Sequence, residues 1–142
     1  MTFNLFHLPG VYGVALGVMI LSGNMASDLL GLIGLFCRKK AYTLGNFGQV
    51  WANYHAIGCL FLGLTNLAVA RDDEGSFGPK ARSVVAMNTA FIYGVWGVQN
   101  TWYLLYRQEL FLPLMWLNAI GCLATAAVSL SNAASSTKKK GQ

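Results

Sequence analysis

The chain has 142 residues, of which 55% are hydrophobic and only 11% are charged, and its net charge is +5. Soluble domains carry about 25% charged residues, so this composition excludes an ordinary soluble domain and is typical of a membrane protein. The length favours a single domain. The basic residues form no polar recognition face, which argues against nucleic acid as a partner.

Four long apolar runs occupy residues 8–37, 47–70, 81–106 and 112–132. A membrane-spanning helix needs about 20 mostly apolar residues, so each run is long enough to cross a bilayer. Barrel strands would alternate over about 10 residues, and these runs do not. We therefore expect an all-α membrane protein, a four-transmembrane-helix bundle in residues 1–134, followed by a flexible basic tail at residues 135–142.

The first run is longer than one span needs, since about 30 residues make some 45 Å of helix. One interpretation is a single long, tilted helix. The other is a span that ends near Leu21, followed by a short interfacial helix at residues 28–36. A turn signal at Gly23 and a helix cap at Ser27 favour the second interpretation.

Two ionisable residues within the runs are candidates for function. An ionised carboxylate deep in lipid costs at least about 2.5 kcal/mol, so Asp28 has to lie near an interface, be paired or be protonated. Asp28 is interpreted either as a residue in the first turn of an interfacial helix or as a buried proton or ligand site. His55 suits either ligand binding or a hydrogen bond to the third run, at Asn100 or Tyr103.

Each run carries a stripe of small and polar residues at the spacing of one helix face. Such faces let membrane helices approach closely and hydrogen-bond to one another, so we expect the stripes to face inward. Gly13 and Gly17 form a Gly-x-x-x-Gly motif, which favours close packing within this chain or between chains. The residues predicted to pack helices together are Gly13, Gly17, Gly58, Gly63, Asn66, Asn118, Cys122 and Thr125.

The third run is unusually aromatic, and its deeper residues form a candidate binding site. Trp102 near its end is typical of an interfacial belt. Tyr93 and Trp96 lie deeper, and with His55 and Asn100 they are the candidates for binding a flat lipophilic cofactor, such as a pigment or quinone, or a structural lipid. An ordinary packed core accounts for the same aromatic residues.

The segment Ala-Ile-Gly-Cys-Leu occurs twice, at residues 56–60 and 119–123. Duplication of a helix pair explains this repeat, and so does coincidence within the narrow alphabet of membrane spans. Residues 51–70, the charged loop behind them and the start of the third run at Ala81 resemble the DoxX-like group of small four-helix membrane proteins. The resemblance covers about half of the chain and implies a four-helix membrane fold without assigning functional residues.

Positive charge indicates the orientation of the bundle. Four spans would place both termini and residues 71–80 on one side of the membrane, and that side carries more Lys and Arg residues than the other. The positive-inside tendency then favours both termini on the cytoplasmic, matrix or stromal side.

The sequence contains no nucleophile–base set, metal-ligand motif or phosphate-binding loop, so we assign no catalytic or metal-binding residues. The leading hypothesis is a non-enzymatic structural or accessory subunit of a larger respiratory or photosynthetic type of membrane complex. Its partners would be the lipid bilayer and other transmembrane subunits. The alternative is a protein that binds a lipophilic cofactor, pigment, quinone or lipid. A third hypothesis is a small transporter or membrane enzyme that uses Asp28 with His55.

Overall fold

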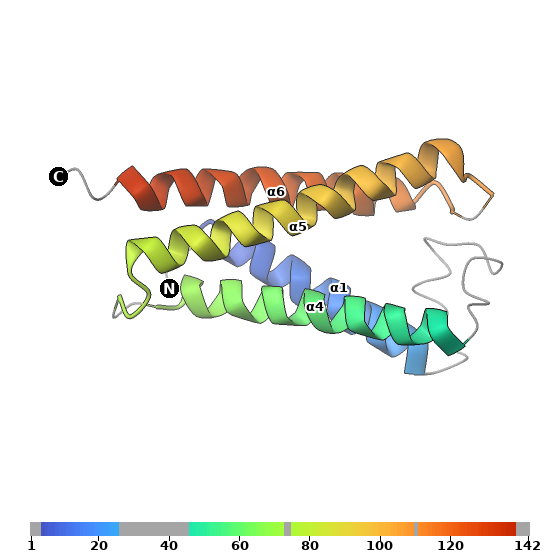
Figure 1. Cartoon of the computed structure of the whole chain (residues 1–142), viewed down its shortest axis with the longest axis horizontal. Coiled ribbons are helices and arrows are strands. Elements are labelled where there is room, and N and C mark those ends of the chain that lie inside the picture. Colours follow the sequence, from blue (N-terminus) through green and yellow to red (C-terminus); the bar gives the residue numbers. More distant parts are fainter. Residues whose placement is uncertain (1–3, 26–45, 73–74, 110, 139–142) are drawn as a thin grey trace.

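The computed structural model describes residues 4–25, 46–72, 75–109 and 111–138, and within these ranges it contains helices and no β-strand. The predicted all-α class is therefore confirmed for this part of the chain. The helices are α1 (His7–Met25), α4 (Asn46–Ala70), α5 (Pro79–Tyr106) and α6 (Met115–Lys138) (Figure 1). Asp28 and the question whether residues 8–37 form one helix or two lie outside the described residues.

Three helices, α1, α4 and α5, begin within two residues of their predicted runs, whereas α6 begins three residues after its run and ends beyond it. Pro79 begins α5, where its missing N–H is one of those that have no partner within the helix. α6 continues to Lys138, so residues 135–138 are helical rather than part of a flexible tail. The hydroxyls of Ser135 and Ser136 in this extension each donate a hydrogen bond to a backbone oxygen one turn back, at 2.8 Å.

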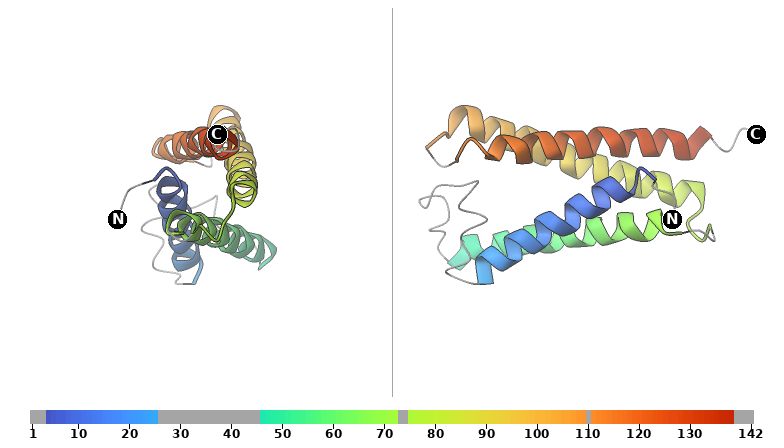
Figure 2. Two further views of the ribbon diagram at one scale, coloured as in Figure 1. Left: turned by 90° about the vertical axis from the view of Figure 1, so that its left-hand side faces the viewer. Right: turned by 180° about the vertical axis from the view of Figure 1, so that it is seen from behind.

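The helices are arranged as two antiparallel pairs. α1 packs closely along α4, and α5 packs closely along α6, while contact between the two pairs is much sparser. Both pairs are seen from the end and from behind in Figure 2. The described start of the chain, the α4–α5 loop and the C-terminal end of α6 lie at one end of the bundle, and the α5–α6 turn lies at the other (Figure 1).

Glycines bring α1 and α4 into backbone contact. A Cβ atom added to Gly63 would lie 2.5 Å from the Val14 nitrogen and 2.9 Å from the Gly10 oxygen. A Cβ atom added to Gly17 would lie 2.8 Å from the Ala56 oxygen. Small residues allow such close approach between membrane helices.

Large apolar side chains are distributed in the opposite way to those of a soluble protein. Large apolar side chains point away from the bundle, for example Phe61 at 70% exposed and Phe91 at 73%. The interior is instead filled mainly by small or polar side chains. These include Ala56, Cys59, Asn66, Ala86, Thr89, Ala119, Cys122, Thr125 and Ser129. Soluble domains place large aliphatic and aromatic residues inside, so this surface is suited to an apolar environment.

Length and composition allow two of the described helices to cross a membrane. These are the segments at residues 53–70 and 115–136, and the apolar segment His7–Leu21 of α1 is shorter. Together with the outward-facing apolar side chains, this agrees with the predicted membrane class.

A carboxylate clamp closes the α4–α5 loop. Asp72 accepts the backbone N–H groups of Ser76 and Phe77, each at 2.8 Å, and pairs with the Arg82 guanidinium at 2.8 Å. Partial desolvation raises the pKa of the Asp72 carboxyl. The Phe77 amide, the Arg82 guanidinium and the Ser76 amide outweigh this effect and hold the pKa below its usual range.

This clamp is expected to open in acid. Because the pKa of Asp72 is lower in the folded chain than in the unfolded chain, its stabilisation is complete above the ordinary value of about 3.9 and is lost as the pH falls through the lower, folded value. The amide proton shifts of Ser76 and Phe77 should report this titration in an NMR series from neutral to acidic pH. Asp72→Asn should flatten the profile, and a midpoint at or above the ordinary value would contradict the clamp.

Candidate functional site

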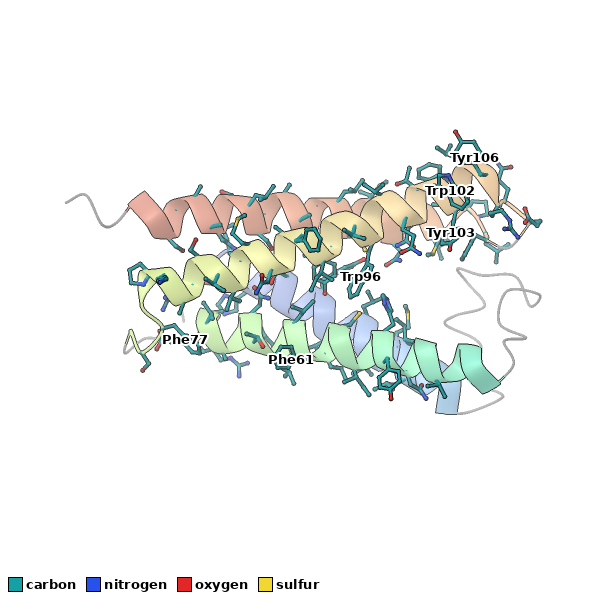
Figure 3. The ribbon with its side chains drawn as sticks, in the orientation of Figure 1. Phe61, Phe77, Trp96, Trp102, Tyr103 and Tyr106 are labelled. Atoms are coloured by element: carbon teal, nitrogen blue, oxygen red, sulfur yellow. The ribbon has the colours of Figure 1, made fainter. Side chains whose placement is uncertain are left out.

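Rings from three helices meet at the centre of the bundle. His55 of α4 lies against Trp96 of α5, with ring centroids 4.2 Å apart, and Tyr93 meets Trp96 edge-on at 5.3 Å. Tyr12 of α1 lies 5.6 Å from Tyr93. Figure 3 shows Trp96 reaching from α5 toward α4 between the two helix pairs. This aromatic cluster joins the pairs where their contacts are few.

Hydrogen bonds next to this cluster connect α1 with α6. The Tyr12 hydroxyl donates to Asn118 Oδ1 at 2.7 Å and lies 3.5 Å from Cys122 Sγ. Asn100 Nδ2 approaches the same sulfur at 3.9 Å. Gly121 makes room for the Tyr12 ring, since a Cβ atom there would lie 2.9 Å from the hydroxyl oxygen.

The four candidate binding residues are only partly brought together. His55, Tyr93 and Trp96 touch in one row, whereas Asn100 lies one turn further along α5 and is directed to Cys122. Within the described residues, His55 forms no hydrogen bond with Asn100 or Tyr103 and packs against Trp96 instead. Because Trp96 is already in contact with two rings, this arrangement favours a packed core over an open slot for a flat cofactor.

The predicted packing residues lie at the helix contacts with one exception. Asn66, Cys122 and Thr125 are buried, and the glycines of α1 and Gly63 form the contact of α1 with α4. Gly58 differs, because a side chain at this position would meet nothing within 4 Å. Gly58 is half-buried and lines a lateral pocket between α4 and α5.

The pocket at Gly58 contains the exposed side-chain amide of Asn88, which was not among the residues predicted from the sequence. Gly58 and Asn88 line a lateral pocket of about 290 Å³ between α4 and α5, together with Phe61, Leu62, Phe91, Ile92 and Trp96. Asn88 is exposed and forms no hydrogen bond within the described residues. The sequence signal that could have identified it is an amide on the apolar face of a run, one residue away from the inward-facing Thr89.

A second polar contact joins α4 and α5 inside the bundle. Asn66 Nδ2 donates to the Leu62 oxygen at 2.8 Å and to Thr89 Oγ1 at 2.9 Å, and Thr89 in turn donates to the Val85 oxygen at 2.8 Å. Several buried polar atoms nevertheless have no partner in the described residues. They are Asn66 Oδ1, the Tyr93 hydroxyl, Ser129 Oγ and Asn132 Nδ2.

The repeated Ala-Ile-Gly-Cys-Leu segments lie in α4 and α6, each the second helix of its pair, and both copies bury Ala and Cys and expose Ile. Cys59 and Cys122, the cysteines of the two copies, are buried in one core cluster. Among the described residues, no three His, Cys, Asp or Glu side chains form a group able to hold a metal ion. Comparisons with protein-family models, curated proteins and solved structures find no match for this chain.

Proposed function

We propose that this chain is a small, non-enzymatic integral membrane protein with four spans, and that it is an accessory subunit of a larger membrane complex. The described helices have 19 to 28 residues. Helices of this size are about 28 to 42 Å long, which suits a hydrocarbon layer of about 30 Å. The outward-facing Phe, Leu, Ile and Val side chains support contact with lipid and with other transmembrane helices.

The side-chain amide of Asn88 is the main observation that supports a partner subunit. Asn88 lies about 13 Å from the start of α5 at Pro79. In the proposed four-span bundle, a centred α5 of 28 residues would extend only about 6 Å beyond the hydrocarbon at each end, so Asn88 would lie within the hydrocarbon depth. Lipid tails offer an amide no hydrogen bond, whereas a polar side chain on a neighbouring helix does.

The lateral pocket beside Asn88 also supports a partner subunit. Gly58 leaves room there for a side chain from outside, and apolar side chains of α4 and α5 form its walls. A helix of another subunit would place an apolar side chain over Gly58 and a polar group on Asn88. We therefore propose that this face of α4 and α5 docks a transmembrane helix of a different protein.

Asn88→Leu is expected to release the chain from its complex without unfolding it. In blue-native electrophoresis after mild solubilisation, the wild type should migrate in a large assembly and the variant mainly as a small species. Met87→Leu is the matched control, because Met87 is an exposed neighbour on α5 outside the Gly58 pocket. The wild type migrating alone, or an assembly that contains only copies of this chain, would contradict an accessory role.

Binding of a structural lipid is the second candidate, and a lateral groove favours it. The groove has a volume of about 750 Å³ and is almost wholly apolar, with Ala90, Gly94 and Val98 of α5 and Leu130 of α6 in its wall. Its size suits a lipid chain. Lipid mass spectrometry of the purified protein should then find one retained species, and Gly94→Leu should release it. Pigment or quinone binding, the DoxX-like resemblance and the side on which the termini lie stay predictions.

A further inference from the structure

The inner face of α6 carries a polar or sulfur-containing side chain on every turn. These residues are Asn118, Cys122, Thr125, Ser129, Asn132 and Ser136. The stripe extends over 19 residues, about 27 Å from first to last, which is nearly the thickness of the hydrocarbon layer. Alanine would allow the same close packing of helices without burying polar atoms. The stripe therefore indicates that polar molecules occupy space between the helices.

Two atoms of this stripe, Ser129 Oγ and Asn132 Nδ2, have no hydrogen-bond partner among the described residues. The same holds for Asn66 Oδ1 on α4. All three residues are at most 4% exposed. A polar group that is buried in a membrane without a partner is strongly unfavourable. Bound water is the usual solution, since one buried water molecule typically makes about three hydrogen bonds to such groups.

Water can enter from one end of the bundle. A recess of about 680 Å³ lies there between the α4–α5 loop and the end of α6, and the polar side chains of Asp72, Arg82 and Ser135 are part of its lining. Asn132 and Ser136 belong both to this recess and to the stripe. Ser129 follows Asn132 one turn further in, at a spacing that places successive side chains about 5–6 Å apart.

Aromatic packing closes the inner end of this path. Tyr93 is fully buried and packs with Leu16 of α1 and Leu62 of α4 in the apolar cluster at the centre of the bundle. Asn66 and Thr89 lie between the recess and this cluster, because Thr89 is one turn nearer than Tyr93 to the start of α5.

We propose that the recess continues into the bundle as a file of bound water molecules along α6. The file passes Asn132 and Ser129, reaches the amide oxygen of Asn66 and stops at the Tyr93 cluster. It is a hydrated inlet that opens on the side of the α4–α5 loop and reaches part of the way across the bilayer. Such a file can carry protons to the interior of the bundle, and it does not depend on the accessory-subunit role.

Water-edited solid-state NMR of the full chain in lipid vesicles tests the inlet. Magnetisation from water should reach the signals of Ser129 and Asn132 almost as fast as those of the exposed Ser135. It should reach Leu130, the neighbour of Ser129 on the lipid face, several times more slowly. If transfer of magnetisation from water to Ser129 and Asn132 is as slow as transfer to Leu130, the proposal is overturned.

Ser129→Ala gives a second test, because it removes one hydroxyl and leaves the packing almost unchanged. If water binds the Ser129 hydroxyl, the midpoint temperature of thermal unfolding should fall by about 3 °C in this variant, since a satisfied buried hydrogen bond is lost. Ser131→Ala, on the exposed face of α6, should leave the midpoint unchanged. An unchanged or higher midpoint for Ser129→Ala means a dry hydroxyl and also overturns the inlet.

Discussion

Gly63→Ala is expected to lower the free energy of unfolding by about 3 kcal/mol or more, because the contact of α1 with α4 has no room for a side chain. The added Cβ atom would lie 2.5 Å from the Val14 nitrogen and 2.9 Å from the carbon of Gly13. Both are backbone atoms, which cannot turn away as the end of a side chain can. α1 would have to separate from α4, and contacts along the whole pair would weaken.

Titration of the protein in mixed micelles with a denaturing detergent, followed by tryptophan fluorescence, measures this loss. Gly58→Ala is the matched control on the same helix, because its Cβ atom would meet nothing within 4 Å. This control should be neutral or should gain up to about 1 kcal/mol from the higher helix propensity of alanine. Equal destabilisation by the two substitutions would mean that close backbone contact between α1 and α4 does not hold the pair together.

Tyr93→Ala is expected to cost about 3–5 kcal/mol, as for other large aromatic residues in a packed core. Its ring is fully buried and contacts both Tyr12 of α1 and Trp96 of α5. Contacts between the two helix pairs are sparse, so the loss of this ring removes a large part of what joins them. The pairs should then separate at a lower detergent fraction than in the wild type.

Tyr93→Phe separates the role of the ring from that of the hydroxyl. The hydroxyl has no hydrogen-bond partner in the described residues and, unlike Ser129, lies beyond the end of the proposed water file, so its removal should change the free energy of unfolding by less than about 1 kcal/mol. The same detergent titration compares the two variants. A loss in Tyr93→Phe as large as that in Tyr93→Ala would show that the hydroxyl, rather than the ring, stabilises the centre.

Helix positions were largely predictable from the sequence, because a long apolar segment has to satisfy its backbone groups within one helix. α5 begins two residues before the predicted run at Ala81, and the burial of Asn66, Tyr93 and Thr125 followed from helical spacing. The end of α6 was missed because hydropathy falls after Asn132. A helix can continue beyond the apolar segment when its side chains are good helix formers or, like Ser135, bond to their own helix.

The pairing of helices and the details of the site could not be predicted in the same way. Nothing in the sequence distinguishes Gly63, which contacts α1, from Gly58, which lines a lateral pocket, because that depends on how α4 is rotated against its neighbours. The contact of His55 with Trp96 likewise depends on how the two pairs are placed. Tyr12 was overlooked, although a tyrosine hydroxyl within a span needs a partner.

The proposed multi-pass bundle places the α4–α5 loop on one side of the membrane and the α5–α6 turn on the other. Single cysteines at Ser76, Ser135 and Gln108, in a chain whose three native cysteines are replaced by alanine, test it directly. In sealed vesicles, an impermeant maleimide should label the positions Ser76 and Ser135 from the same side, and the position Gln108 only from the opposite side. Labelling of all three from one side would contradict the account.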